Sequence, residues 1–134
     1  MKKAICIILV AICMLIPFSS FAAVKALSAD WSGNGSYTTD KSISKPDSTS
    51  TTRYKWNSPI KVRLDSLSAG SSVTIKPVNA NNVSMGYSIT YSSTMTTFSD
   101  MPLSNVNYMH IHLKITANSG VHTEGVWKGT YYAV

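Results

Sequence analysis

Cysteine is almost absent from this sequence, and its placement limits the chemistry of the protein. The chain of 134 residues has two cysteines, Cys6 and Cys13, both within its first 22 residues. That segment begins Met-Lys-Lys, continues with an apolar run from Ala4 to Ile16 and ends at Ser-Phe-Ala22, which is the pattern of a secretory signal peptide. We expect its removal on export to leave about 112 residues without a disulfide, a thiolate metal ligand or a cysteine nucleophile.

Long apolar runs and dense charge are also missing. The apolar run of the signal is too short to span a bilayer. Charged residues make up 13% of the chain, and without the two lysines of the signal ten basic residues face six acidic ones, a net charge of about +4. These basic residues are scattered and form no stripe or cluster, which argues against a nucleic-acid-binding protein.

Recognisable catalytic motifs are absent as well. The carboxylates are far apart in the sequence, and neither a Gly-x-Ser-x-Gly motif nor a phosphate-binding loop occurs. They are Asp30, Asp40, Asp47, Asp65, Asp100 and Glu124. An enzyme needs a convergent set of acid, base, nucleophile or metal ligands. We therefore expect no catalysis and no cofactor.

Short segments of alternating polarity are abundant, whereas no helical period extends over eleven residues after the signal. Val, Ile, Leu, Met and aromatic residues alternate with polar ones in 37–43, 54–56, 60–64, 73–78, 85–91, 94–98 and 109–115. Turn residues separate these segments, as at 32–35, 79–82 and 118–120. This pattern predicts a single all-β domain, with a β-sandwich favoured over a closed barrel.

The last ten residues, Gly-Val-Trp-Lys-Gly-Thr-Tyr-Tyr-Ala-Val, read as a strand that ends with the chain. Alternation places Trp127, Gly129, Tyr131 and Ala133 on one face, which would bury two large aromatic rings. With no segment after it, this strand would have a free edge. An exposed hydrophobic edge promotes aggregation, so we expect another strand to pair with it.

This layout resembles a bacterial chaperone–usher fimbrial (pilin) subunit. The residues that carry the resemblance are Gly125, Trp127, Gly129 and Tyr131, with Tyr132 third from the end. It implies an immunoglobulin-like sandwich that lacks its last strand, completed first by a periplasmic chaperone and then by the N-terminal strand of the next subunit. That subunit would pass through the periplasm and an outer-membrane usher into a surface fimbria. The lack of a disulfide resembles the cysteine-free colonisation-factor type.

The resemblance also assigns parts of the chain. Residues 1–22 would be the signal, 23–33 an N-terminal extension and 34–134 the sandwich. The donor strand would use Val24, Ala26, Leu27, Ala29 and Trp31. The groove beside the terminal strand would be lined by Trp127, Gly129, Tyr131 and Ala133. Such strand addition takes affinity from backbone hydrogen bonds and specificity from alternate side chains. The expected partners are neighbouring subunits, the chaperone and usher, and a host receptor or glycan.

A second hypothesis is a free-standing secreted or periplasmic β-sandwich that binds a glycan, a small ligand or a metal. In that case residues 23–31 would pair within their own domain. His110 and His112 share one face of a predicted strand and, with His122, could ligate zinc or copper. Solvated polar positions explain these histidines more simply. Trp31, Tyr37, Tyr54, Trp56 and Tyr108 could stack on sugars, although core packing explains most of them.

Overall fold

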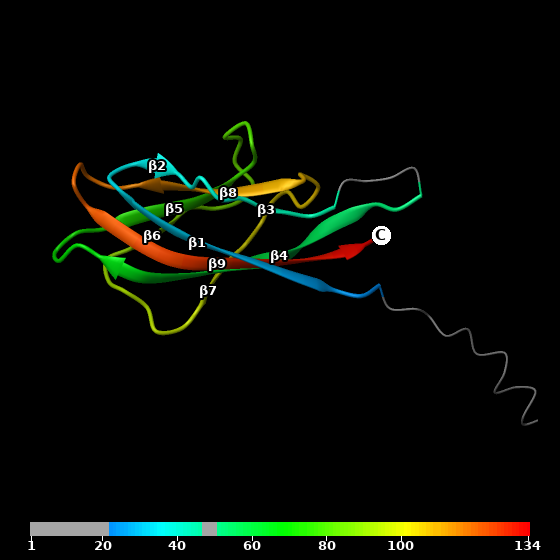
Figure 1. Ribbon diagram of the computed structural model, residues 1–134, viewed down its shortest axis with the longest axis horizontal. Coiled ribbons are helices and arrows are strands. Elements are labelled where there is room, and N and C mark those ends of the chain that lie inside the picture. Colours follow the sequence, from blue (N-terminus) through cyan, green and yellow to red (C-terminus); the bar gives the residue numbers. More distant parts are fainter. Residues whose placement is uncertain (1–21, 47–50) are drawn as a thin grey trace, which may run out of the picture.

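The computed structural model describes residues 22–46 and 51–134, and every regular element in these ranges is a β-strand (Figure 1). The predicted signal peptide lies outside the described residues except for Ala22. Within the described ranges, no helix has the length and apolar character needed to cross a membrane. The sequence-based prediction of an all-β domain is therefore confirmed.

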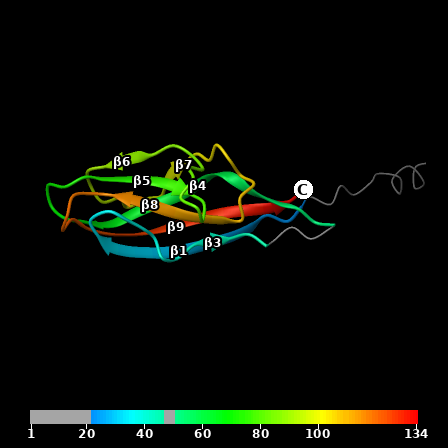
Figure 2. The same ribbon diagram turned by 90° about the horizontal axis from the view of Figure 1, so that it is seen from above.

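Two antiparallel sheets form the domain. The first, called sheet A, has the order β1 (Lys25–Asn34), β9 (His122–Ala133), β4 (Tyr54–Leu67) and β7 (Ser99–Met101). The second, called sheet B, has the order β2 (Tyr37–Thr38), β8 (His110–Thr116), β5 (Val73–Val78) and β6 (Ile89–Tyr91), and β3 (Ile43–Ser44) also pairs with β8. Figures 1 and 2 show the two layers of this β-sandwich.

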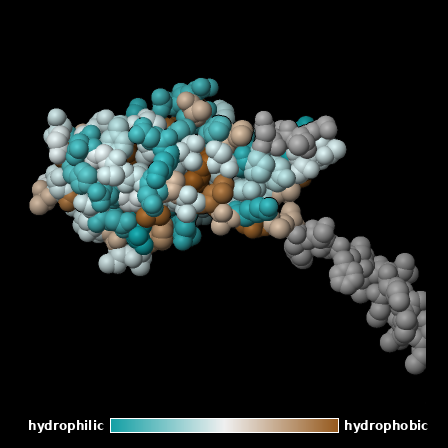
Figure 3. All heavy atoms as spheres, in the orientation of Figure 1, coloured by the Kyte–Doolittle hydropathy of each residue, from teal (hydrophilic) through white to brown (hydrophobic). Residues whose placement is uncertain are grey.

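The core lies between the sheets and follows the alternation of the sequence. The inward residues of β4 (Ile60, Val62 and Leu64) and of β8 (Ile111, Leu113 and Ile115) are fully buried. Successive side chains of a strand point to opposite faces, so the intervening Lys61, Arg63, His112 and Lys114 point outward. Polar residues consequently dominate the surface, and hydrophobic residues appear as small patches on the face shown in Figure 3.

Some predicted strands have other bounds in the structure. β4 joins the predicted segments 54–56 and 60–64, with a register shift against β9 between Asn57 and Lys61. Pro59 lies at this shift, where its missing N–H costs the ladder no bond. The terminal strand is longer than predicted and begins at His122.

Residues 85–98 depart furthest from the prediction, because they make few ladder bonds. The predicted strand 85–91 is reduced to β6, and 94–98 forms no strand. Met85 is fully buried, its amide donates to the Pro77 carbonyl, and its own carbonyl accepts from the amides of Ser104 and Asn105. Met85 thus bonds to β5 on one side and to the irregular segment at Ser104 and Asn105 on the other. Only isolated bridges form beside it, at Ser84 and Gly86, so its alternation with Tyr87 does not belong to a continuous strand.

β1 forms one edge of sheet A, and its first residues lie at the same end of the molecule as the C-terminus (Figure 1). Its register against β9 runs without a shift from Lys25 opposite Tyr131 to Asn34 opposite His122. In this single chain, the segment predicted as an N-terminal extension therefore covers the edge of its own terminal strand.

Candidate functional site

The terminal strand β9 is the centre of the candidate site. Trp127 is fully buried, Gly129 and Tyr131 are buried, and Ala133 is half-buried. This is the face that alternation predicts as common to these four residues, and it points into the core. The ring of Tyr131 meets those of Tyr54 and Trp56 edge to face, with centroids 5.7 and 6.0 Å away. These contacts anchor β9 on β4 and leave its other edge to β1.

β1 covers that edge with little buried surface. Trp31 is its one buried residue, and Leu27 and Ala29 are half-buried. Of the other two positions on this face, Gly33 has no side chain and Lys25 is exposed. Ala26 is exposed on β1, and Val24, just before the strand, is 58% exposed. The five residues predicted for the donor strand therefore divide into an inward set of three and an exposed pair.

Trp31 fits β9 because its Cα partner is Gly125. A Cβ at position 125 would lie 2.5 Å from Cζ2 of Trp31 and would also collide with the carbonyl oxygen of Arg63. The glycine thus lets the indole and the neighbouring strand approach the backbone closely. The indole Nε1 of Trp31 is buried and has no hydrogen-bond partner among the described residues.

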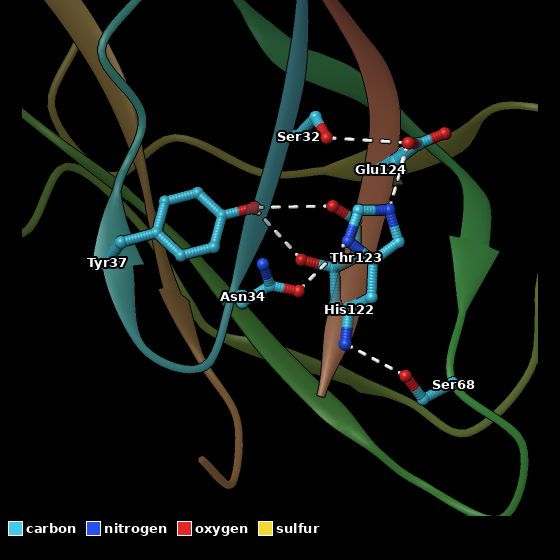
Figure 4. Close-up of polar contacts among 7 residues, drawn as sticks. All are labelled: Ser32, Asn34, Tyr37, Ser68, His122, Thr123 and Glu124. Carbon is cyan, nitrogen blue, oxygen red and sulfur yellow. Dashed lines mark hydrogen bonds and ion pairs between the residues drawn. The ribbon is translucent and has the colours of Figure 1, made fainter. Parts of the chain in front are cut away.

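A polar network fastens the end of β1 that lies next to the following turn (Figure 4). His122 Nδ1 lies 3.1 Å from Asn34 Oδ1, and His122 Nε2 lies 2.9 Å from Glu124 Oε1. The Ser32 hydroxyl donates to the same Glu124 oxygen over 3.4 Å. The His122 amide donates to Ser68 Oγ, which ties the start of β9 to the end of β4. These bonds hold the register of β1 against β9.

Tyr37 adds a second contact to this region from sheet B. Its hydroxyl lies 2.9 Å from Thr123 Oγ1 (Figure 4). Burial raises the pKa of the Tyr37 phenol, the bond to Thr123 lowers it in part, and the charges of Asp40 and Glu124 raise it further. The neutral phenol is therefore the form that the fold favours.

Replacing Tyr37 with Phe should lower the free energy of unfolding by about 0.5–1.5 kcal/mol at neutral pH, because the Thr123 hydroxyl loses its partner. Because the folded-state pKa is raised, the unfolded phenol ionises first as the pH rises through about 10. The stability from the neutral phenol is thus complete below that pH and is lost above it. Urea unfolding of the unmodified protein and of Tyr37→Phe, at pH 8 and above pH 10, measures this effect. The difference between their free energies of unfolding should be smaller at the higher pH, and a larger difference there would contradict this account.

A hollow of about 620 Å³ lies beside the same part of β1. It is lined by Asp30, Trp31, Ser32, Tyr37, Thr39, Asp40, Lys41, Asp65, Glu124, Gly125 and Val126. Four carboxylates that are far apart in the sequence thus meet around one aromatic pair. Sequence reasoning missed this grouping because it depends on the register of β1 and β9 and on the loop after β2, for which no local motif exists.

The three histidines do not come together. His110 and His112 lie on the outer face of sheet B, with their Nδ1 atoms 2.6 Å from Ser44 Oγ and 3.1 Å from the Thr39 carbonyl oxygen. His122 lies on β9 in sheet A. Among residues 22–46 and 51–134, no three His, Cys, Asp or Glu side chains are grouped as metal ligands would be.

The aromatic residues do not form one platform either. Trp31 and Trp56 are buried, and Trp56 Nε1 donates to the Tyr108 carbonyl oxygen at 2.8 Å. Tyr37 and Tyr54 are half-buried, and Tyr108 is 38% exposed. Most of these rings belong to the core or pack against it.

Comparison with known proteins gives a fold and no family. No protein-family model and no curated protein match the chain. A solved structure described as "Cyanophage Pam1 capsid asymmetric unit" contains a chain similar to this one, with a TM-score of 0.52 and 14% sequence identity over 87% of this chain and 89% of that chain. At this identity the likeness is one of fold alone.

Proposed function

We propose that the protein is a structural or adhesive subunit of a surface fimbria, in which β1 of one copy pairs with β9 of the next. The observation that carries this proposal is that a single edge strand near the start of the described chain covers the terminal strand. β1 is ten residues long, makes its contacts mainly with β9, and buries one side chain, Trp31. A strand held in this way can be replaced by an identical strand from another copy with no change in the groove.

The connection after β1 supports the same proposal. Only Gly35 and Ser36 join β1 to β2, and Gly35 has a φ of 65°, which favours glycine. A change of backbone angles at this joint would swing β1 out and leave residues 37–134 in place. Gly35 lies two residues after position 33, where the N-terminal extension is expected to end from the resemblance.

The remaining parts of the proposal come from the resemblance. Export by the signal peptide would bring the chain to the periplasm, where a chaperone would protect the edge of β9 until the next subunit supplies its β1. An outer-membrane usher would then pass the growing polymer to the cell surface. The physical need for such protection is the unpaired backbone of β9 whenever β1 is elsewhere.

A free-standing ligand-binding sandwich is the second candidate function. It is favoured by the pairing of β1 with β9 of the same chain and by the hollow lined by Trp31, Tyr37 and four carboxylates. A hollow of this size is in the range of small-molecule sites. In this case β1 would stay in its own domain, and the protein would remain a monomer.

Engineered cysteines separate the two functions. Ala26 on β1 and Thr130 on β9 are direct Cα partners, and directly opposed residues of antiparallel strands are close enough for a disulfide. No native cysteine follows residue 22, so the introduced thiols would be the sole ones in the exported chain. In the Ala26→Cys/Thr130→Cys protein, exchange of β1 should give a ladder of disulfide-linked oligomers on non-reducing gels after export.

The control places the second cysteine on sheet B. Thr116 is exposed on β8, away from β1, so Ala26→Cys/Thr116→Cys should give no ladder. A linked monomer as the sole product of the Ala26→Cys/Thr130→Cys protein would contradict strand exchange and favour the free-standing sandwich. Co-expression of the two single variants gives a further check, because their heterodimer can form a disulfide only when β1 of one chain meets β9 of the other.

A further inference from the structure

The outer face of sheet B carries rows of hydroxyl and basic side chains. The register places Thr74 between Thr90 and Thr116 in one row. In the next row Lys114 lies between Lys76 and Thr38. Further along β8, His112 and His110 continue the same outward face. These eight residues are called the basic face.

Lys76 and Lys114 are directly opposed on neighbouring strands, which brings two positive charges together at a cost to the fold. Lys114 is exposed and Lys76 is half-buried. Among the described residues, neither ammonium group has an ion pair, a hydrogen bond or an aromatic ring as its partner. The charges are thus left available to an anion from outside.

Sheet A contains a second pair of opposed lysines, which shows how the chain can compensate such a repulsion. Lys61 lies opposite Lys128. There, Lys61 Nζ binds Asp100 Oδ1 at 2.6 Å, and Lys128 Nζ lies 3.9 Å from the centre of the Phe98 ring. The pair on sheet B has neither kind of partner within the described residues.

The distribution of carboxylates reinforces the contrast. Strands β2, β3, β5, β6 and β8 contain no Asp or Glu. Of the carboxylates in the described ranges, four lie on strands of sheet A and the fifth, Asp40, lies in the loop between β2 and β3. His110 and His112 each use Nδ1 within the protein, and Nε2 has no protein partner in the described residues.

We propose that the basic face binds an anionic polysaccharide, with Lys76 and Lys114 paired to successive sulfate or carboxylate groups and the threonine row in contact with sugar hydroxyls. Charge complementarity and a flat array of hydroxyls suit such a chain. None of the eight residues is a Trp, Tyr or Phe, the side chains on which bases of single-stranded nucleic acids stack. The site lies on the sheet opposite β1 and β9, so it does not depend on strand exchange.

Heparin as a sulfated probe and dextran as a neutral one test the proposal on the purified exported protein. Retention on immobilised heparin at low salt, with none on dextran, is the expected result. The Lys76→Gln/Lys114→Gln variant should bind heparin at least about tenfold more weakly and show a shallower dependence on salt. The Lys61→Gln/Lys128→Gln variant has the same net charge and should bind within about twofold of the unmodified protein.

Equal losses in the two double variants would overturn the proposal, because net charge alone would then explain binding. Absence of heparin binding, or tighter binding to single-stranded DNA than to heparin at the same salt, would overturn it as well. Melting temperature gives a second measurement: heparin should raise it for the unmodified protein and leave it unchanged for Lys76→Gln/Lys114→Gln.

Discussion

Replacing Trp127 with Ala should lower the free energy of unfolding by about 3–5 kcal/mol, which is the usual cost of removing a large buried aromatic side chain. Trp127 is fully buried in β9 and lies opposite Val62 of β4 and Ala29 of β1. The cavity would therefore open between the sheets and beneath β1. Its Nε1 is buried without a partner among the described residues, which offsets a small part of the loss.

Urea unfolding followed by tryptophan fluorescence and circular dichroism measures this effect. Tyr132 provides the control, because it lies on the outer face of the same strand and is half-buried. Tyr132→Ala should cost less than about 1 kcal/mol. If the two substitutions cost the same, the inward face of β9 would be assigned incorrectly.

Gly125→Ala should be nearly as severe, at about 3 kcal/mol, although it adds a single methyl group. The new Cβ would collide with the Arg63 carbonyl oxygen, which the β4–β9 ladder holds in place, and with the indole of Trp31. One of the two must move. Because β1 lies at the edge, we expect Trp31 and β1 to move away first.

Gly129→Ala is the matched control on the same strand. Its Cβ would lie 3.0–3.4 Å from side-chain atoms of Ile43, Trp56 and Ile60, which can shift by the small amount needed. We expect a cost of about 1 kcal/mol or less. Hydrogen exchange tests whether β1 is the strand that moves. The amides of β1 should exchange faster in Gly125→Ala and at an unchanged rate in Gly129→Ala, and equal rates in the two variants would contradict the expected movement of β1.

The contrast between these glycines also changes what Gly129 is expected to do. The resemblance places Gly129 in the groove that receives a donor strand, so a larger residue there would be expected to block docking. In the structure, the neighbours of a side chain at 129 are core residues, so a larger residue there would disturb the packing of the two sheets first. Gly125, which is not among the residues predicted to line the groove, is the glycine that accommodates β1 through Trp31.

Local patterns in the sequence were enough to predict the class of fold and the faces of the main strands. Period-two alternation in 60–64, 109–115 and 125–134 is a local property, since successive residues of an extended chain point to opposite sides. It therefore predicted the buried sides of β4, β8 and β9 correctly. It failed at 85–98, where buried Met85 lies between isolated bridges at Ser84 and Gly86 and only Ile89–Tyr91 forms a strand.

Which strands pair, and in which register, is visible only in the folded domain. No local signal pairs β1 with β9 or places Lys76 opposite Lys114, since these residues are far apart along the chain. The gathering of Asp30, Asp65 and Glu124 around one hollow has the same origin. Strand pairing is a choice among many backbone edges of equal hydrogen-bonding capacity, and the packing of side chains such as Trp31 over Gly125 selects one of them.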